Sequence, residues 1–206
     1  PDLDQSLPID GIRESLFDAL RRGPAVVTAP TGTGKSTQVP RWCRALGRVL
    51  VIEPRRVACS GLAQRVASLE GQDLGEGVGY VVRDDRRARR DTEITFATPG
   101  VVLRWFADGA APVHDVVIFD EFHERSFDVD LLLALLRQGG RHRLVVTSAT
   151  VDGARLADYL CARHLKAEGR SFPVEVSYTD ELELPRLHEL PNRAAAAVEK
   201  ILRECP

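Results

Sequence analysis

The sequence predicts an α/β domain of three layers, in which a mainly parallel sheet is covered by helices on both faces. Short runs of apolar, largely β-branched residues alternate along the chain with segments whose apolar residues recur at helical spacing. Strands that are apolar throughout and separated by helices are typical of parallel sheets buried on both sides. With 206 residues, 44% hydrophobic and 28% charged, the chain is long enough for one full hydrophobic core.

The individual elements follow from apolar periodicity and from turn residues. The first predicted helix has apolar residues at helical spacing from Ile9 to Leu20, and Gly23-Pro24 ends it. The predicted strands are Ala25–Ala29, Arg48–Ile52, Ile94–Thr98, Asp115–Phe119, Arg143–Ser148 and Val174–Tyr178. The other predicted helices are Lys35–Leu46, Arg56–Leu69, Gly100–Ala107, Phe127–Arg137, Gly153–Cys161 and Arg193–Arg203. The arginine-rich stretch Arg83–Asp91 is predicted to be a solvated loop, with contact to nucleic acid as the alternative.

Composition excludes several classes of protein. The net charge of −2 and the pI of about 6.3 exclude a basic field around the molecule, so that any nucleic acid must bind in a local groove. The four cysteines include no C-x-x-C pair, which argues against a zinc site and a disulfide framework. No apolar run approaches the roughly 18 residues that span a bilayer, and the N-terminal residues lack a signal-peptide pattern. We therefore expect a cytoplasmic protein with no membrane contact. Since the chain begins at Pro1 and lacks methionine, we also expect it to be part of a longer protein.

A glycine-rich segment between the first predicted strand and the next predicted helix indicates a phosphate-binding loop. Residues 29–37 read Ala-Pro-Thr-Gly-Thr-Gly-Lys-Ser-Thr. Gly32 and Gly34 let the backbone curl so that several N–H groups point into one concavity, and the helix N-terminus adds partial positive charge. Lys35 can reach the β- and γ-phosphates, while Ser36 can complete the coordination of Mg²⁺. The strict pattern has glycine rather than alanine at the first position, and a glycine-rich turn without a ligand is the alternative.

An acidic pair directly follows the apolar run Val116–Phe119. In an open α/β sheet, ligands bind at the carboxyl ends of the strands, where Asp120 and Glu121 are expected to lie. Asp120 is suited to hold Mg²⁺, mostly through water, and Glu121 to orient and deprotonate an attacking water. Alone, such a pair is more often the solvated start of a helix. Together with the phosphate loop, it predicts a site that hydrolyses a magnesium-bound nucleotide.

Five segments occur in the order of the motifs of superfamily 2 helicases. They are Ala-Pro-Thr-Gly-Thr-Gly-Lys-Ser (29–36), Glu-Pro-Arg-Arg-Val-Ala (53–58), Thr-Pro-Gly (98–100), Asp-Glu-Phe-His-Glu-Arg-Ser (120–126) and Ser-Ala-Thr (148–150). Residues 78–83 and 169–175 also resemble segments of DEAH-box RNA helicases, and Phe122 resembles the HrpB-type bacterial branch of that family. Over residues 7–180 the chain therefore resembles the first RecA-like motor domain of a DEAH-box ATP-dependent RNA helicase.

The resemblance implies a RecA-like fold, with ATP and Mg²⁺ as cofactors and other nucleoside triphosphates left open. The residues that it implies for binding the phosphates are Thr31, Gly32, Thr33, Gly34, Lys35, Ser36 and Thr37. Those implied for catalysis are Glu121, Lys35 and Asp120, and those implied for the metal are Ser36, Asp120 and Glu121. His123, Ser148 and Thr150 would couple the nucleotide state to domain closure. Arg65 would stack on the adenine, which favours loose selectivity for the base because stacking reads no base edges.

Arg55, Arg56 and Thr98 match positions that hold the nucleic-acid backbone in this family, which implies single-stranded RNA as a partner. For the arginines, a surface ion pair is the alternative. DNA also stays open, because contacts to the phosphate backbone do not distinguish the two sugars, whereas contacts to the 2′-hydroxyl do.

The family's second motor domain carries an arginine-rich motif that reaches the γ-phosphate, and no such segment follows Ser148-Ala149-Thr150. We therefore predict that residues 1–180 form the first RecA-like domain and that residues 181–206 lead, as linker and helix, towards the second. The chain alone is expected to bind nucleotide but to hydrolyse it poorly. The predicted function is the motor of an ATP-dependent RNA helicase. The alternatives are a DNA-translocating ATPase and a nucleotide-gated binding module without turnover of its own.

Overall fold

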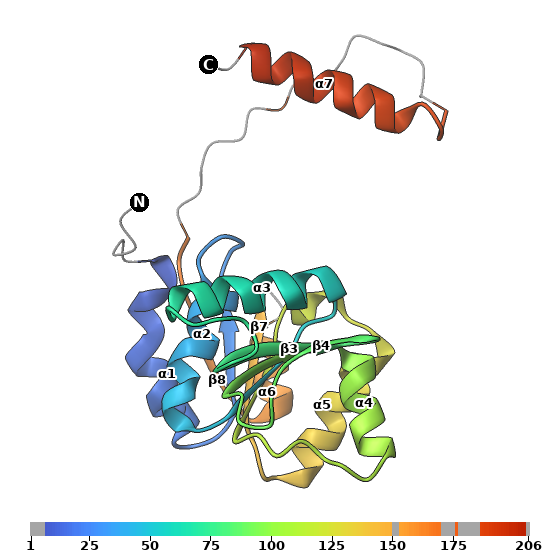
Figure 1. Ribbon diagram of the computed structural model, residues 1–206. Helices are drawn as coiled ribbons and strands as arrows, with labels where there is room; N and C mark the ends of the chain where they lie inside the picture. The colour runs from blue at the N-terminus through green and yellow to red at the C-terminus, as the bar shows by residue number, and fades with distance from the viewer. Residues whose placement is uncertain (1–6, 150–152, 170–175, 177–185, 205–206) are drawn as a thin grey trace. The chain divides into compact units, whose positions relative to one another are not determined.

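The computed structural model describes residues 7–149, 153–169, 176 and 186–204 (Figure 1). The chain divides into two compact units, Pro1–Arg170 and Ser171–Pro206. In the larger unit, eight strands form one sheet in the order β4-β3-β5-β2-β6-β7-β1-β8. Neighbouring strands are parallel except for β3 and β4, which are antiparallel. The predicted α/β fold with a mainly parallel sheet is confirmed.

The elements have the following bounds. The strands are β1 (Ala25–Thr28), β2 (Val49–Ile52), β3 (Val78–Val82), β4 (Asp85–Arg87), β5 (Ile94–Ala97), β6 (Val116–Phe119), β7 (Arg143–Ser148) and β8 (Arg163–Lys166). The α-helices are α1 (Arg13–Leu20), α2 (Lys35–Cys43), α3 (Arg56–Leu69), α4 (Pro99–Ala107), α5 (Phe127–Gly139), α6 (Gly153–Leu160) and α7 (Leu190–Glu204). Three 3-10 helices are η1 (Pro8–Ile12), η2 (Arg44–Leu46) and η3 (Phe122–Glu124). The predicted strand Val174–Tyr178 lies outside the described residues apart from Val176, and so does the predicted boundary after residue 180.

The sheet separates two hydrophobic cores, because alternate residues of a buried strand point to opposite faces. In β2, Val49 and Val51 pack in the core beneath α1, α2 and α3. Leu50 and Ile52 pack in the other core, to which α4, α5 and α6 contribute. Figure 1 shows these two groups of helices on opposite faces of the sheet. Since both faces are covered, ligands have access to the central strands only from their ends.

The structure corrects the prediction at three strands. β3, β4 and β8 were not predicted from the sequence, and the solvated loop expected over Arg83–Asp91 contains β4. Asp84 makes the turn between β3 and β4 with a positive φ of 63°, and the Tyr80 hydroxyl donates a hydrogen bond to Asp85 Oδ2 at 2.6 Å. All three residues of β4 are exposed, so this edge strand needs no apolar side chains and carries none of the pattern that predicts a buried strand.

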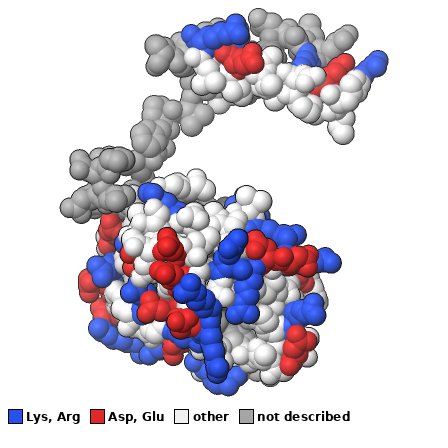
Figure 2. Space-filling model, in the orientation of Figure 1, with Lys and Arg blue, Asp and Glu red and all other residues white. Residues whose placement is uncertain are grey.

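Charges of both signs are interspersed over the visible face of the larger unit, as Figure 2 shows. No broad surface of one sign appears on that face, in agreement with a net charge of −2. Within the described residues, no helix combines the length and the apolarity that crossing a bilayer requires.

His114 is a buried titratable group that lies two residues before the start of β6. Its side chain stacks on Trp105 with ring centroids 6.5 Å apart, and neither ring nitrogen has a hydrogen-bond partner among the described residues. Burial, with a smaller contribution from the nearby charge of Arg48, lowers the pKa of His114 to about 4. The native protein therefore holds this imidazole neutral where the unfolded chain would protonate it.

We predict that His114 makes the domain sensitive to acid. As the pH falls from 6.5 to 4, the unfolded chain takes up a proton at His114 that the native protein does not, so the free energy of unfolding falls by about 3 kcal/mol. His114→Phe keeps a ring against Trp105 and should flatten the pH dependence of chemical denaturation in that window. His188→Phe, at an exposed histidine of the smaller unit, is the control. Profiles of equal slope for His114→Phe and the unaltered protein would contradict this assignment.

Candidate functional site

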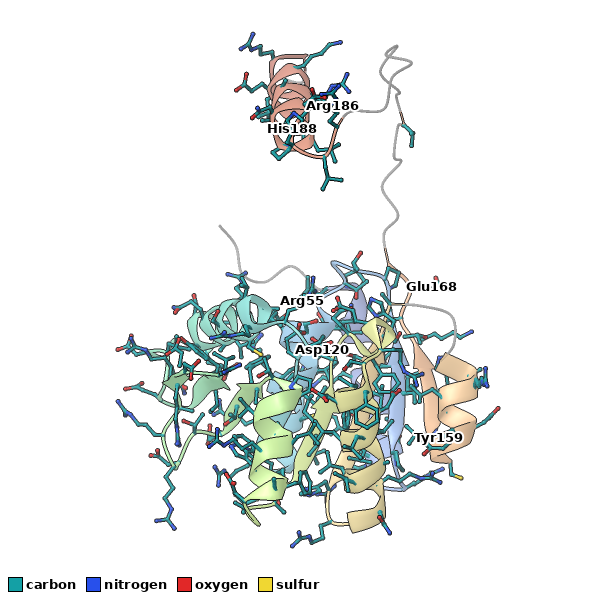
Figure 3. All side chains as sticks on the ribbon, turned by 90° about the vertical axis from the view of Figure 1, so that its right-hand side faces the viewer. Arg55, Asp120, Tyr159, Glu168, Arg186 and His188 are labelled. Carbon is teal, nitrogen blue, oxygen red and sulfur yellow. The ribbon has the colours of Figure 1, made fainter. Side chains whose placement is uncertain are left out.

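The carboxyl ends of the parallel strands bring most of the predicted site residues to one edge of the sheet. Figure 3 shows Arg55 and Asp120 at this edge. The predicted residues there are Thr31–Thr37 after β1, Arg55 and Arg56 after β2, Thr98 after β5, Asp120, Glu121 and His123 after β6, and Ser148 at the end of β7. Arg65 lies two turns into α3, and Thr150 lies outside the described residues.

The loop after β1 has the backbone that its glycines predict. Gly32 has φ of 78° and Gly34 has φ of 95°, both in the left-handed region, and α2 begins directly after Gly34. A Cβ atom on Gly34 would lie 2.7 Å from Cδ1 of Leu7, so a side chain here would displace Leu7 in addition to straining the backbone. The Thr33 hydroxyl donates a hydrogen bond to the Pro30 carbonyl at 2.8 Å, which stabilises the turn. The two glycine conformations and this hydrogen bond therefore define the shape of the loop.

The loop and the acidic strand end meet through a buried ion pair. Lys35 Nζ lies 2.8 Å from Oε1 of Glu121, and only 4% and 13% of the two side chains are exposed. An ammonium and a carboxylate that are removed from water need such a partner, because burying either charge alone is costly. The structure therefore brings the phosphate loop and the carboxylate at position 121 into one site.

One buried carboxylate oxygen of Asp120 has no hydrogen-bond partner among the described residues. Its Oδ1 accepts hydrogen bonds from the Thr147 hydroxyl and, at 3.0 Å, from the Glu121 backbone N–H. Its Oδ2 is buried and meets no donor in hydrogen-bond geometry among the described residues. Burial raises the pKa of Asp120, and the hydrogen bond from Thr147 acts in the opposite direction. A carboxylate oxygen without a donor, close to the Ser36 hydroxyl, is a donor set that fits Mg²⁺.

Glu121 is held in an uncommon backbone conformation. Its φ of 48° and ψ of 40° lie in the left-handed region, which costs a residue other than glycine about 1–3 kcal/mol. Its Oε2 lies 3.3 Å from Nδ1 of His123, and that nitrogen also accepts the Ala149 backbone N–H at 3.4 Å. A short chain of contacts therefore runs from Glu121 through His123 to the segment that follows Ser148.

The predicted nucleic-acid contacts lie at the ends of two adjacent strands, β2 and β5. Arg55 is 62% exposed, and its guanidinium lies 3.4 Å from Glu124 and 3.6 Å from Glu53. The exposed Arg56 donates to the carbonyl of Arg83, and Thr98 is buried at the start of α4. The ion pair considered as the alternative for Arg55 is therefore present, and nucleic-acid contact by these residues stays a prediction.

A pocket of about 380 Å³ opens between the phosphate loop and α3. It is lined by Ser36, Glu53, Arg55, Ala58, Gly61, Leu62 and Glu121. Arg65 is exposed and follows Gly61 and Leu62 by one helical turn, which places it on the pocket-lining face of α3. Within the described chain, its guanidinium makes no ion pair, so it is available to a ligand.

Two residues of this site were missed by the sequence reasoning, Glu53 and Thr147. Glu53 is 1% exposed at the end of β2, and burial and the charge of Asp120 raise its pKa to about 7. The Thr147 hydroxyl, on the neighbouring strand β7, donates a hydrogen bond to the carboxylate of Asp120. A signal was present for Glu53, since an acidic residue follows an apolar strand there as it does at Asp120. Thr147 has no comparable signal, because its role depends on the neighbour that the sheet provides.

Comparison with known proteins identifies the family. The model of the DEAD/DEAH box helicase family matches residues 11–159. The chain belongs to this family. It is 39% identical to the ATP-dependent RNA helicase HrpB of Escherichia coli over 97% of its length, and 35% identical to human ATP-dependent RNA helicase DHX33 over 98%. A crystal structure of E. coli DEAH/RHA helicase HrpB matches 98% of the chain with a TM-score of 0.83 and 38% identity. The predicted likeness to the first RecA-like domain of an HrpB-type DEAH-box helicase is confirmed.

The helicase-family domain is a small part of these relatives. The chain spans 26% of E. coli HrpB and 30% of human DHX33 in the curated sequences, and 27% of the HrpB chain in the crystal structure. The activities of the whole relatives therefore come to this chain only as proposals.

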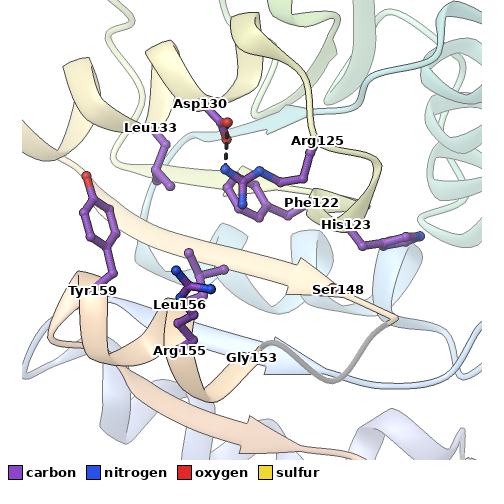
Figure 4. A pocket seen from close by; sticks show the side chains of 10 residues that line it. All are labelled: Phe122, His123, Arg125, Asp130, Leu133, Ser148, Gly153, Arg155, Leu156 and Tyr159. Carbon is purple, nitrogen blue, oxygen red and sulfur yellow. Dashed lines mark hydrogen bonds and ion pairs between the residues drawn. The ribbon is translucent and has the colours of Figure 1, made fainter.

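A second pocket of the helicase-family domain, of about 450 Å³, lies between α5 and α6 (Figure 4). It is lined by Phe122, His123, Arg125, Asp130, Leu133, Ser148, Gly153, Arg155, Leu156 and Tyr159. Arg125 pairs with Asp130 at 2.7 Å, and its guanidinium lies 5.1 Å from the ring centroid of Phe122. His123 and Ser148 thus line a pocket separate from the one that Ser36 and Glu121 line.

We predict that Thr147 positions Asp120 for the metal. Thr147→Val removes the hydroxyl that donates to buried Asp120, which should lower the free energy of unfolding by about 1–3 kcal/mol and weaken magnesium-dependent nucleotide binding. Chemical denaturation and calorimetric titration with Mg-nucleotide measure the two effects. Thr95→Val is the matched control, since Thr95 is a buried threonine of β5 whose side chain makes no hydrogen bond within the described residues. Equal effects of the two substitutions would contradict the prediction.

Proposed function

We propose that this chain is the nucleotide-binding motor domain of an ATP-dependent RNA helicase. In the full-length protein, magnesium-dependent hydrolysis of a nucleoside triphosphate would drive movement along nucleic acid. The observation that carries the proposal is the 2.8 Å contact between Lys35 Nζ and Glu121 Oε1, because it joins a phosphate-binding loop to a carboxylate suited to activate water. Membership of the DEAD/DEAH box helicase family supports the same conclusion.

The phosphates would bind the loop from Thr31 to Thr37, whose backbone N–H groups and helix N-terminus favour anions. Lys35 would turn from Glu121 to the β- and γ-phosphates. Ser36 and Asp120, with Glu121 beside them, would hold Mg²⁺, which neutralises charge on the phosphates when it is bound. Asp120 Oδ2, which meets no hydrogen-bond donor in the part of the chain that the structure describes, supports this arrangement.

Glu121 would act as the general base. Once Lys35 contacts phosphate, the carboxylate of Glu121 is free to orient a water molecule and to accept its proton. Its Oε2 already contacts His123, and His123 contacts Ala149. Through these contacts His123, Ser148 and Thr150 would report the nucleotide state to the rest of the protein.

Arg65 would stack on the nucleobase, a contact that accepts the adenine of ATP and tolerates other bases. Arg55, Arg56 and Thr98 would contact the phosphates of single-stranded RNA at the neighbouring strand ends. A second RecA-like domain of the full-length protein would complete the site with an arginine, so the first domain alone would bind nucleotide and hydrolyse it poorly. Residues 1–180 would form the first domain, residues 181–206 would lead towards the second, and the protein would work in the cytoplasm.

Glu121→Gln is predicted to separate binding from hydrolysis. The amide keeps the shape of the side chain but accepts no proton, so the full-length protein should bind Mg-ATP and lose about 100-fold or more of its ATPase rate. Glu124→Gln, three residues along the chain, should leave hydrolysis within a few-fold of the unaltered protein. The measurements are calorimetric binding and phosphate release. A Glu121→Gln protein with undiminished turnover would overturn the role of general base.

The nucleic-acid substrate is predicted to be RNA. Single-stranded RNA should stimulate the ATPase of the full-length protein more than single-stranded DNA of the same sequence and length. The steady-state rate, measured against the concentration of each strand at a fixed salt concentration, provides the comparison. Equal or greater stimulation by DNA would favour a DNA-translocating ATPase, and the absence of any turnover would favour a nucleotide-gated binding module.

A further inference from the structure

Glu53 occupies the position between the predicted RNA contacts and the predicted metal site. Its strand β2 lies between β5 and β6, so Glu53 has Thr98 on one side and Asp120 on the other at the carboxyl ends. Backbone hydrogen bonds fix this placement: Glu53 N–H donates to Ala97 at 3.0 Å, and Asp120 N–H donates to Ile52 at 2.9 Å. The side chain of Glu53 is 1% exposed. A carboxylate is therefore built into the sheet edge between the two predicted functional regions.

The two oxygens of Glu53 have different surroundings. Oε1 accepts the Arg55 backbone N–H at 3.1 Å and lies 3.6 Å from Nε of the same residue. Oε2 is buried and has no hydrogen-bond partner among the described residues. Glu53 also lines the 380 Å³ pocket together with Ser36 and Glu121. One side chain thus holds Arg55 and borders the space that the phosphates and metal would occupy.

Arg55 has a choice of partners. Besides Glu53, its guanidinium lies 3.4 Å from Glu124, and it is 62% exposed. The ion pair of Arg55 with the partly exposed Glu124 is worth about 0–1 kcal/mol, so a phosphate of RNA can replace that contact at little cost. The guanidinium of Arg55 can therefore contact either the two carboxylates or a phosphate of RNA. A charge placed near Glu53 changes the balance between them, because electrostatic interactions are strong where water is excluded.

We propose that Glu53 is a positioning residue that couples RNA binding by Arg55 to occupancy of the Mg-nucleotide pocket. The proposal rests on the function proposed above. A bound metal and phosphates change the field at the buried carboxylate, and the carboxylate transmits this change to Arg55 through its contacts with the backbone N–H and Nε. By linkage, the same coupling makes nucleotide affinity depend on RNA.

The test is a thermodynamic cycle in the full-length protein. The affinity for a fluorescent single-stranded RNA is measured without nucleotide and with a saturating, non-hydrolysable ATP analogue plus Mg²⁺. The two affinities of the unaltered protein should differ about fivefold or more, in line with typical couplings between sites. In Glu53→Gln, which keeps the shape and the acceptor for the Arg55 N–H, they should differ by about twofold or less.

Two further variants make the result specific. Glu124→Gln removes the other partner of Arg55 without altering a residue that lines the 380 Å³ pocket, so it should change both RNA affinities alike and keep their ratio. Glu53→Asp retains the charge and should restore part of the coupling that Glu53→Gln loses. Thermal unfolding checks that each variant is folded.

The outcomes separate the two proposals. If the unaltered protein does not take up Mg-nucleotide, both the proposed function and this inference fail. If it does, but Glu53→Gln keeps the affinity ratio of the unaltered protein, or the unaltered protein shows no coupling, the role of Glu53 fails while nucleotide binding stands. Loss of coupling in Glu124→Gln to the same extent as in Glu53→Gln would also overturn the assignment to Glu53.

Discussion

The ion pair of Lys35 and Glu121 is the constraint around which the site is arranged. It joins the beginning of α2 to the end of β6, two segments far apart in the sequence, at the edge where the parallel strands end. A buried pair of this kind contributes little net stability, because removing both charges from water offsets their attraction. Its consequence is positional: each charge keeps the other in the site until a ligand with phosphate oxygens competes for the lysine.

Most of the ionisable groups around that pair are acidic. Glu53, Asp120 and Glu121 place three carboxyl groups at adjacent strand ends, and Lys35 is the buried cation among them. Burial raises the pKa of Asp120 and that of Glu53, the latter to about 7, which shows how poorly the protein alone compensates these charges. A divalent cation would compensate these charges, so the electrostatics of the site favour the binding of a metal ion.

The central strands of the sheet and the glycine-rich loop of the candidate site could be predicted from the sequence. β2 and β6 are continuous apolar runs followed directly by acidic residues, and β1 is apolar up to Thr28; their burial leaves a clear pattern in the sequence. β4 has only exposed charged residues, and β8 is polar at three of its four positions, so neither resembles a buried strand. Thr147 and Glu53 act through neighbours on adjacent strands, and the order of strands in a sheet cannot be predicted from a local sequence pattern. The predicted residues in the phosphate loop were accessible because consecutive residues form that loop.

The ion pairs of Arg55 and the proposed contact of Arg55 with nucleic acid are compatible for a physical reason. An arginine held by two carboxylates at 3.4 and 3.6 Å, with most of its side chain in water, is oriented but weakly bound. A free side chain of this length would lose about 2 kcal/mol of rotamer entropy when a phosphate immobilised it. The carboxylates reduce that loss by restricting Arg55 beforehand, and they also repel phosphates that approach anywhere except at the guanidinium. If Arg55 contacts RNA as proposed, its acidic surroundings would favour a single position for the nearest phosphate of a bound strand.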